Sequence, residues 1–223
     1  MTTLFLVRHG ENLANITKEF SYRAVDYPLT PKGILQAEQT AEYFADGSID
    51  AIYTSPLLRA RQTAEILTRR IAVPVHLREE LREINVGSLE GASTPENWAL
   101  YHRISAAWYA GQAEVAFPDG EDLRMVAARF LSCVGEVVAT HLSGSAVIVG
   151  HGGVYTACIA LLCLEIDLPT LLTQPNHNCS ITKVEAALTE DGRVQGVLRE
   201  WAACGHLHGV AAELIPALPD DSS

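Results

Sequence analysis

Two short apolar runs, far apart in the chain, each end at a histidine beside glycine. Residues 3–7 lead into Arg-His-Gly at positions 8–10, and residues 145–149 lead into Gly-His-Gly-Gly at positions 150–153. A short apolar run containing β-branched residues that stops at polar residues and glycine is typical of a buried strand opening into a loop. We therefore expect a fold built on a buried sheet, with chemistry at the ends of its strands.

Helix signals alternate with these strands. Thr30 is a suitable N-cap and Pro31 a suitable first helical residue, which predicts a helix running to about residue 45. Its apolar face is expected to comprise Ile34, Ala37, Ala41 and Phe44.

A second strand, residues 51–54, is followed by Ser55 and Pro56, a similar cap-and-proline pattern that predicts the start of the helix carrying Arg59. Further extended segments are expected at 73–77, 180–187 and 194–201, and a long helix at about 122–141. Alternating strands and helices predict an α/β fold, a three-layer sandwich with a mainly parallel central sheet whose binding crevice lies at the carboxyl ends of the strands.

The region of about 92–120 interrupts this alternation and is richer in aromatic and turn residues, so we interpret it as a small helical cap insertion. A chain of 223 residues favours one domain over two independent ones. We expect a single domain over residues 1–215 and a flexible acidic tail at 216–223.

The formal net charge of −11 argues against nucleic acid or an anionic membrane surface as a partner. The first apolar run lacks a preceding basic region, and no stretch of about 20 apolar residues is present, so we expect a cytoplasmic protein. Any bound anion must be captured by a local cluster of positive groups. The sequence leaves open whether the chain is a homodimer.

Neither the cysteines nor the remaining histidines predict a metal site. The five cysteines are scattered and odd in number, which favours reduced, packed thiols over a disulfide framework. His206 and His208 lack a third ligand at a recognisable spacing, so no metal and no cofactor is expected.

Four basic or cationic groups follow predicted strands at the same edge of the sheet: Arg8, His9, Arg59 and His151. A guanidinium group can hold two phosphate oxygens at once, and the N-terminus of the helix after His151 adds positive potential. This combination predicts a phosphate site.

At this point the sequence resembles the histidine phosphatase superfamily, the phosphoglycerate-mutase-like enzymes, and specifically its small phosphatase branch. The resemblance rests on blocks that occur in order over residues 3–182: Arg8-His9-Gly10-Glu11 with Asn15, Pro28-Leu29-Thr30 with Gly33, Ser55-Pro56-Leu57 with Arg59-Ala60 and Gln62-Thr63-Ala64, Leu81-Arg82-Glu83-Ile84 with Gly87 and Glu90-Gly91, Gly120-Glu121, Gly150-His151-Gly152-Gly153, and Asn178-Cys179-Ser180.

The resemblance implies a metal-independent, acid-type histidine phosphatase that acts on a small phosphorylated substrate. His9 would be the nucleophile, and Glu83 the proton donor, which then has to hold a proton near neutral pH. The phosphoryl oxygens would be bound by Arg8, Arg59 and His151, with additional hydrogen bonds from Asn15, Gly152 and Asn178.

Two alternatives stay open. In a cofactor-dependent phosphoglycerate mutase, the phosphohistidine returns its phosphoryl group to bound product. Ala14 stands where mutases of the family usually carry tryptophan, and the stretch from Glu83 to His151 is short for a mutase, so hydrolysis is favoured. A non-catalytic phospho-ligand-binding protein would have no need of a proton donor beside a nucleophile.

The specificity region is less defined. Four cations are candidates for the entrance, namely Lys18, Arg23, Arg82 and Arg103. Four aromatic residues of the predicted cap recur at roughly helical spacing, which favours core packing for most and substrate contact for one or two: Trp98, Tyr101, Trp108 and Tyr109.

Overall fold

A computed structural model describes residues 1–174 and 176–215, and in this part of the chain six strands form one sheet. The strands are β1 (Thr2–Arg8), β2 (Ala51–Thr54), β3 (Val75–Leu77), β4 (Ser145–Gly150), β5 (Ile181–Leu188) and β6 (Val194–Ala203). Their order is β3-β2-β4-β1-β5-β6. The pairs among the first four are parallel, whereas β5 is antiparallel to β1 and to β6. The predicted α/β class with a mainly parallel sheet is confirmed.

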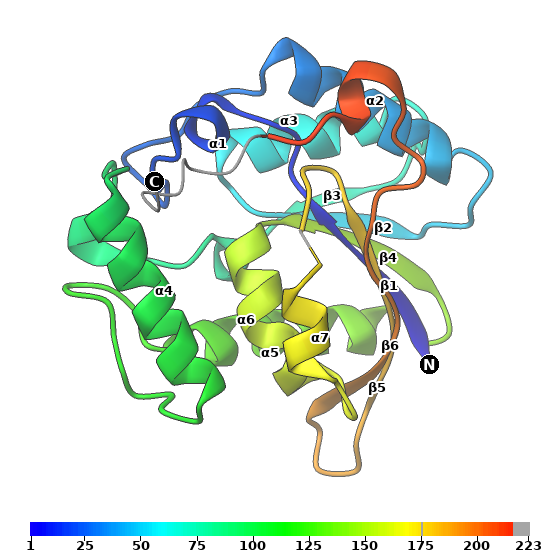
Figure 1. Cartoon of the computed structure of the whole chain (residues 1–223). Helices are drawn as coiled ribbons and strands as arrows, with labels where there is room; N and C mark the ends of the chain where they lie inside the picture. Colours follow the sequence, from blue (N-terminus) through cyan, green and yellow to red (C-terminus); the bar gives the residue numbers. More distant parts are fainter. Residues whose placement is uncertain (175, 216–223) are drawn as a thin grey trace.

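Helices cover both faces of this sheet (Figure 1). On one side lie α2 (Pro31–Phe44) and α3 (Leu58–Leu67), and on the other α5 (Leu123–Thr140) and α6 (Gly152–Leu162). The remaining helices are α1 (Leu13–Thr17), α4 (Pro95–Tyr109), α7 (Leu168–Leu172) and the 3₁₀ turns η1 (Glu79–Leu81), η2 (Gly87–Leu89) and η3 (Gly209–Ala212).

The three layers follow from the period of two along each strand. In β1, Leu4 and Leu6 join the cluster that contains residues of α5 and α6, whereas Val7 joins the cluster formed with α2 and α3. In β4, Ile148 and Val149 separate in the same way. Because both faces of the central strands are buried, their sequences read as continuous apolar runs.

The start of α2 agrees with the prediction, and three of the four residues of its predicted apolar face, Ala37, Ala41 and Phe44, are buried. Thr30 accepts a hydrogen bond from the backbone N–H of Gly33 at 3.0 Å, and Pro31 is the first helical residue. Ile34, predicted to be buried, is 41% exposed. Gly33 lies on the inward face in place of Ile34, and its backbone approaches Glu11 so closely that a Cβ would lie 2.1 Å from the Glu11 carbonyl oxygen.

The predicted start of α3 is wrong by two residues. Ser55 and Pro56 precede the helix, which begins at Leu58 without a side-chain bond from its own N-cap residue. Asp26, from a distant loop, accepts the backbone N–H of Leu58 at 2.9 and 3.0 Å and takes the capping role. Ser55 is thereby left for the site described below.

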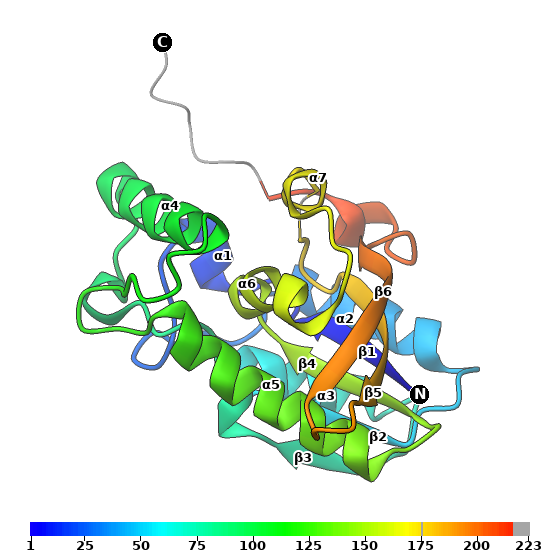
Figure 2. The ribbon, with the colours of Figure 1, turned by 90° about the horizontal axis from the view of Figure 1, so that it is seen from below.

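The helix α4 lies away from the sheet and beside α1, as both views show (Figures 1 and 2). Trp98 donates its indole N–H to the carbonyl oxygen of Lys18 at 2.9 Å, and its ring lies 4.3 Å from that of Phe20. One side of α4 therefore faces the carboxyl edge of the sheet. The predicted tail, 216–223, lies outside the described residues.

No helix within the described ranges is long and apolar enough to cross a membrane.

Candidate active site

The structure gathers the predicted site residues at the carboxyl ends of β1 and β4, around a cavity of about 810 Å³. Seven of the eight line it: Arg8, His9, Asn15, Arg59, Glu83, Gly152 and Asn178. His151 lies directly behind the wall, fully buried, with its ring centroid 5.2 Å from that of His9. The residues thus share one location, and their chemical roles stay predictions.

The contacts of His9 define the tautomer of its ring. Nδ1 lies 2.7 Å from the carbonyl oxygen of Gly10, which can only accept, so Nδ1 carries the hydrogen. Nε2 accepts from Nε of Arg59 at 3.1 Å. Burial, followed by the charges of Arg59 and Arg8, holds the pKa of His9 well below 6.5. The imidazole is therefore neutral near pH 7, with its lone pair on Nε2.

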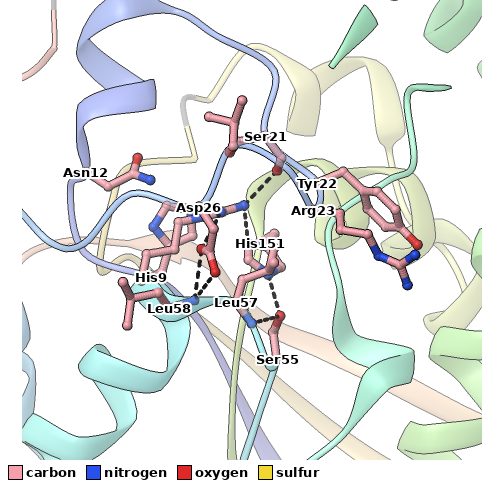
Figure 3. A network of polar contacts seen from close by, with 12 residues as sticks. His9, Asn12, Ser21, Tyr22, Arg23, Asp26, Ser55, Leu57, Leu58 and His151 are labelled. Carbon is pink, nitrogen blue, oxygen red and sulfur yellow. Dashed lines mark hydrogen bonds and ion pairs between the residues drawn. The ribbon is translucent and has the colours of Figure 1, made fainter. Parts of the chain in front are cut away.

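His151 has the opposite tautomer. Its Nδ1 lies 3.2 Å from Nη2 of Arg59, which can only donate, and its Nε2 therefore donates to Oγ of Ser55 at 2.7 Å (Figure 3). Burial first, then the charge of Arg59 and the neighbouring His9, lowers the pKa of His151 well below 6.5. The sequence predicted Ser55 as a helix cap, whereas its hydroxyl group contacts His151, which lies 96 residues later at the junction of β4 and α6.

Arg59 joins the two histidines. Its side chain is 2% exposed, and besides His9 and His151 it donates to the carbonyl oxygen of Ser21 at 2.9 Å. Burial lowers the pKa of Arg59 to about 10, with Glu83 and Asp26 opposing that shift, so the group stays charged near neutral pH. Two neutral imidazoles therefore share a permanent cation.

Two buried N–H donors in this pocket have no hydrogen-bond acceptor among the described residues. Nη1 of Arg59 is buried without a hydrogen-bond partner among the described residues, with Asp26 only in ion-pair range at 3.7 Å. Nε of Arg8 is also buried and unpartnered, although its Nη1 donates to the carbonyl oxygen of Asn176. Because buried donors normally have partners, two such guanidinium groups indicate a site for an anion.

The carboxyl group of Glu83 lies at the N-terminus of α6. It accepts the backbone N–H of Gly153 at 3.1 Å, that of Val154 at 2.9 Å and that of Ile84 at 2.9 Å. The glycine permits this approach, because a Cβ at residue 153 would lie 2.7 Å from Oε1 of Glu83. The α6 terminus and the Glu83 side chain thus fix one another.

Replacing Gly153 with alanine should lower kcat by about 10- to 100-fold, because the new methyl group displaces Glu83 and small misplacements in a reacting site are costly. The free energy of unfolding should change by less than about 1 kcal/mol. Steady-state kinetics and thermal unfolding of Gly153→Ala measure the two effects. Gly205→Ala is the matched control, because a Cβ there meets nothing within 4 Å. An unchanged kcat in Gly153→Ala would show that the position of Glu83 is unimportant.

Asn178 braces the loop that carries His9. Its Nδ2 donates to the carbonyl oxygen of His9 and to Oδ1 of Asn15, both at 3.0 Å. Those two bonds use both hydrogens of the amide. The predicted contacts of Asn15 and Asn178 with a phosphate stay predictions.

Of the predicted entrance cations, the structure places Lys18 in the cavity wall, where burial followed by the charge of Arg8 lowers its pKa. The other three, Arg23, Arg82 and Arg103, are absent from the wall as the described residues form it, and Arg82 instead pairs with Glu79 at 2.6 Å.

Three of the four cap aromatics line the cavity, which is more than the one or two that the sequence predicted for substrate contact. Trp98, Tyr101 and Tyr109 line the cavity, whereas Trp108 is 3% exposed in the core.

Sequence reasoning missed several groups that hold the site. Thr63 accepts the backbone N–H of Gly10 at 3.0 Å, His177 lines the cavity, and Asp26 caps α3 beside Arg59. Only Asp26 carried a recognisable signal, an isolated acidic residue before a proline-containing turn. Within the described residues, no three His, Cys, Asp or Glu side chains are grouped to hold a metal ion, and the five cysteine thiols are free.

Residues 4–198 match the model of the histidine phosphatase superfamily (branch 1). The chain is 31% identical to the uncharacterized phosphatase PhoE of Bacillus subtilis, covering 84% of this chain and 90% of that protein. It is 32% identical to a probable phosphoglycerate mutase, GpmB, of Proteus mirabilis, over 83% of this chain and 85% of that one. A mycobacterial glucosyl-3-phosphoglycerate phosphatase solved in complex with VO3 is 28% identical, with a TM-score of 0.76, covering 91% of this chain and 99% of that chain.

Proposed function

Because the chain belongs to the histidine phosphatase superfamily, we propose that it hydrolyses phosphomonoesters through a phosphohistidine formed on His9, with Glu83 as proton donor. One observation carries this proposal. The lone pair on Nε2 of a neutral, buried His9 lies among two guanidinium groups that keep unpartnered donors. A neutral nucleophile and an anion site coincide there.

In the first step, Nε2 of His9 attacks phosphorus, and the bond from phosphorus to the leaving-group oxygen breaks. Arg59 exchanges its bond to Nε2 for a phosphoryl oxygen, which frees the lone pair, and the unpartnered Nε of Arg8 takes another oxygen. His151 becomes a further donor when the bound phosphoryl charge draws a proton from solvent onto its Nδ1, and this proton returns to solvent when phosphate leaves. Glu83 gives its proton to the leaving oxygen, which departs as an alcohol.

In the second step, water attacks the phosphohistidine while Glu83, now ionised, accepts the proton of the water. The bond from phosphorus to nitrogen breaks, which returns neutral His9 and releases inorganic phosphate. The same fixed cations stabilise the negative charge in both steps, since they are oriented before the reaction.

The rest of the cavity supports a small phosphorylated substrate whose leaving group lies against the α4 side. The cavity is far larger than a phosphate group, and Trp98, Tyr101 and Tyr109 line it. Relatives named as a phosphatase and as a glucosyl-3-phosphoglycerate phosphatase support hydrolysis, whereas the relative named as a probable phosphoglycerate mutase keeps mutase chemistry as the alternative to be tested. The proposal keeps the cytoplasmic location expected from the sequence.

We expect hydrolysis to proceed in a metal chelator, because two guanidinium groups supply the charge that a metal would otherwise provide. The assay uses an aryl phosphate, suited to the aromatic wall, with excess chelator and ³²P-labelled substrate. Quenched enzyme should carry label that is stable to base and labile to acid, as a phosphoramidate is.

Activity should persist below pH 6.5 in the same assay, because the pKa of His9 lies well below that value and its imidazole therefore stays neutral.

Each outcome of this experiment is informative. Loss of activity in chelator, restored by a divalent metal, would overturn the proposal. Labelled enzyme that isomerises 3-phosphoglycerate faster than it releases phosphate would identify a mutase. Labelled enzyme without turnover would identify a phospho-ligand-binding protein.

A further inference from the structure

The segment that carries Glu83 has little regular structure of its own. It lies between η1 and η2, and residues 82–86 belong to no helix or strand. A side chain on such a segment is placed only as well as its backbone is held. The position of Glu83 therefore depends on the contacts that hold this backbone on the side away from the cavity.

Arg129, on α5, holds it with a complete set of hydrogen bonds. All five N–H groups of its guanidinium are used. Its acceptors are the carbonyl oxygens of Glu80 at 2.7 Å, Arg82 at 2.7 Å and Glu83 at 3.0 Å, and the Glu121 carboxylate oxygens at 2.8 and 3.0 Å. Three carbonyl groups from residues 80–83 thus converge on one side chain.

Glu121 completes the arrangement. Its Oε2 also accepts the backbone N–H of Asn85 at 2.8 Å, and its own N–H donates to the carbonyl oxygen of Asn85 at 2.8 Å. Gly120 permits this approach, since a Cβ there would lie 2.4 Å from the Asn85 carbonyl oxygen. The side chains of Glu121 and Arg129 are only 10% and 18% exposed. The Arg129–Glu121 ion pair thus holds the backbone of residues 80–85 through several hydrogen bonds.

We propose that Arg129, fixed by Glu121, is a positioning residue that sets the place of the Glu83 carboxylate through the backbone of residues 80–85. This inference rests on the proposed role of Glu83 as proton donor. The cavity side of Glu83 is held by the N-terminus of α6, and the far side by Arg129, so the carboxyl group has one position relative to His9. Lysine cannot replace Arg129, because it has three donors without the planar fork.

The test compares two substrates. An alkyl phosphate has a leaving group that needs a proton, whereas 4-nitrophenyl phosphate has one that departs without help. The measured quantity is kcat/KM, which reports the steps up to leaving-group departure. General acid catalysis contributes about 10²- to 10⁴-fold, so Arg129→Met should lose at least about 30-fold on the alkyl ester and less than about 3-fold on the aryl ester. Loss of folding alone would lower both values equally.

Matched variants complete the design. Arg124→Met is the control, because Arg124 on the same helix forms a similar ion pair with the N-cap residue Asp122. It is 66% exposed and, within the described residues, makes no hydrogen bond to residues 80–85. Arg129→Lys and Glu121→Gln should show the same selective loss of kcat/KM on the alkyl ester. They replace Arg129→Met in the test if circular dichroism shows that Arg129→Met does not fold. The double variant Glu83→Gln with Arg129→Met should be no worse than Glu83→Gln, since both changes remove one function.

Two failures are distinguishable. If Glu83→Gln lowers kcat/KM equally for both substrates, Glu83 is not the proton donor, and the proposed mechanism is wrong. If Glu83→Gln is selective for the alkyl ester but the Arg129 and Glu121 variants are not, only the positioning role is overturned.

Discussion

Replacing His9 with alanine should reduce kcat by at least about 10⁴-fold, the scale on which removal of a nucleophile acts in covalent catalysis. The reason is specific to this pocket. Nε2 of His9 has a lone pair that Arg59 holds in place at 3.1 Å, and His9 lines the cavity. The lone pair of His151 is on Nδ1 instead, and His151 lies behind the cavity wall with its Nε2 bonded to Ser55. Steady-state hydrolysis of an aryl phosphate and the disappearance of the ³²P-labelled enzyme measure the effect.

The control for this variant is His208→Ala, which removes an exposed histidine outside the cavity wall and should leave kcat unchanged. Inorganic phosphate should still bind to His9→Ala with a Kd within about tenfold of the parent, because the anion is held by the guanidinium groups. Retention of labelled enzyme in His9→Ala would place the phosphoryl group on another residue and refute the assignment.

Replacing Arg59 with methionine should lower kcat/KM by about 10³-fold. Removal of one oriented donor from a charge-stabilising site costs about 10²- to 10³-fold, and Arg59 supplies more than one. Arg59→Lys should recover little, because an ammonium group cannot reach His9, His151 and a phosphoryl oxygen together. Arg61→Met, an exposed position two residues along α3, is the matched control and should be unaffected.

The same variant has a second readout that a loss of folding would not produce. The charge of Arg59 is the second cause, after burial, of the low pKa values of both His9 and His151. In Arg59→Met both pKa values should therefore rise toward 6.5, which NMR titration of the ring protons measures. Unchanged histidine titration, with activity retained, would contradict the arrangement described here.

The pattern of strands and helices could be predicted because each element carried a local signal. Residues 3–7 and 145–149 are buried on both faces, and such strands read as unbroken apolar runs. Thr30 and Pro31 form a cap and first turn that act over four residues, so no distant partner is needed. The neighbourhood of His9 and His151 followed from the rule that parallel strands present their carboxyl ends at one edge.

What could not be predicted depends on contacts between distant segments. Asp26 caps α3 across 32 residues, so the local signal of Ser55 and Pro56 indicated the wrong start. The exposed side chain of Ile34 follows from a contact between the backbones at Gly33 and Glu11. Arg129 bonds to carbonyl oxygens 46 to 49 residues earlier, and carbonyl groups leave no trace in a sequence.

The position of β1 in the sheet determines when the active-site fold can form during synthesis of the chain. Thr3 pairs with Ser145 on one side and with Glu185 on the other, so the first strand made lies between β4 and β5, which are made only after β2 and β3. At translation rates of about 5 to 20 residues per second, the β1 strand waits roughly 7 to 30 seconds for the first of them to be synthesised. A nascent chain therefore carries His9 from the start but has no pocket around it, and a chain cut short before β4 has an apolar first strand without its partners.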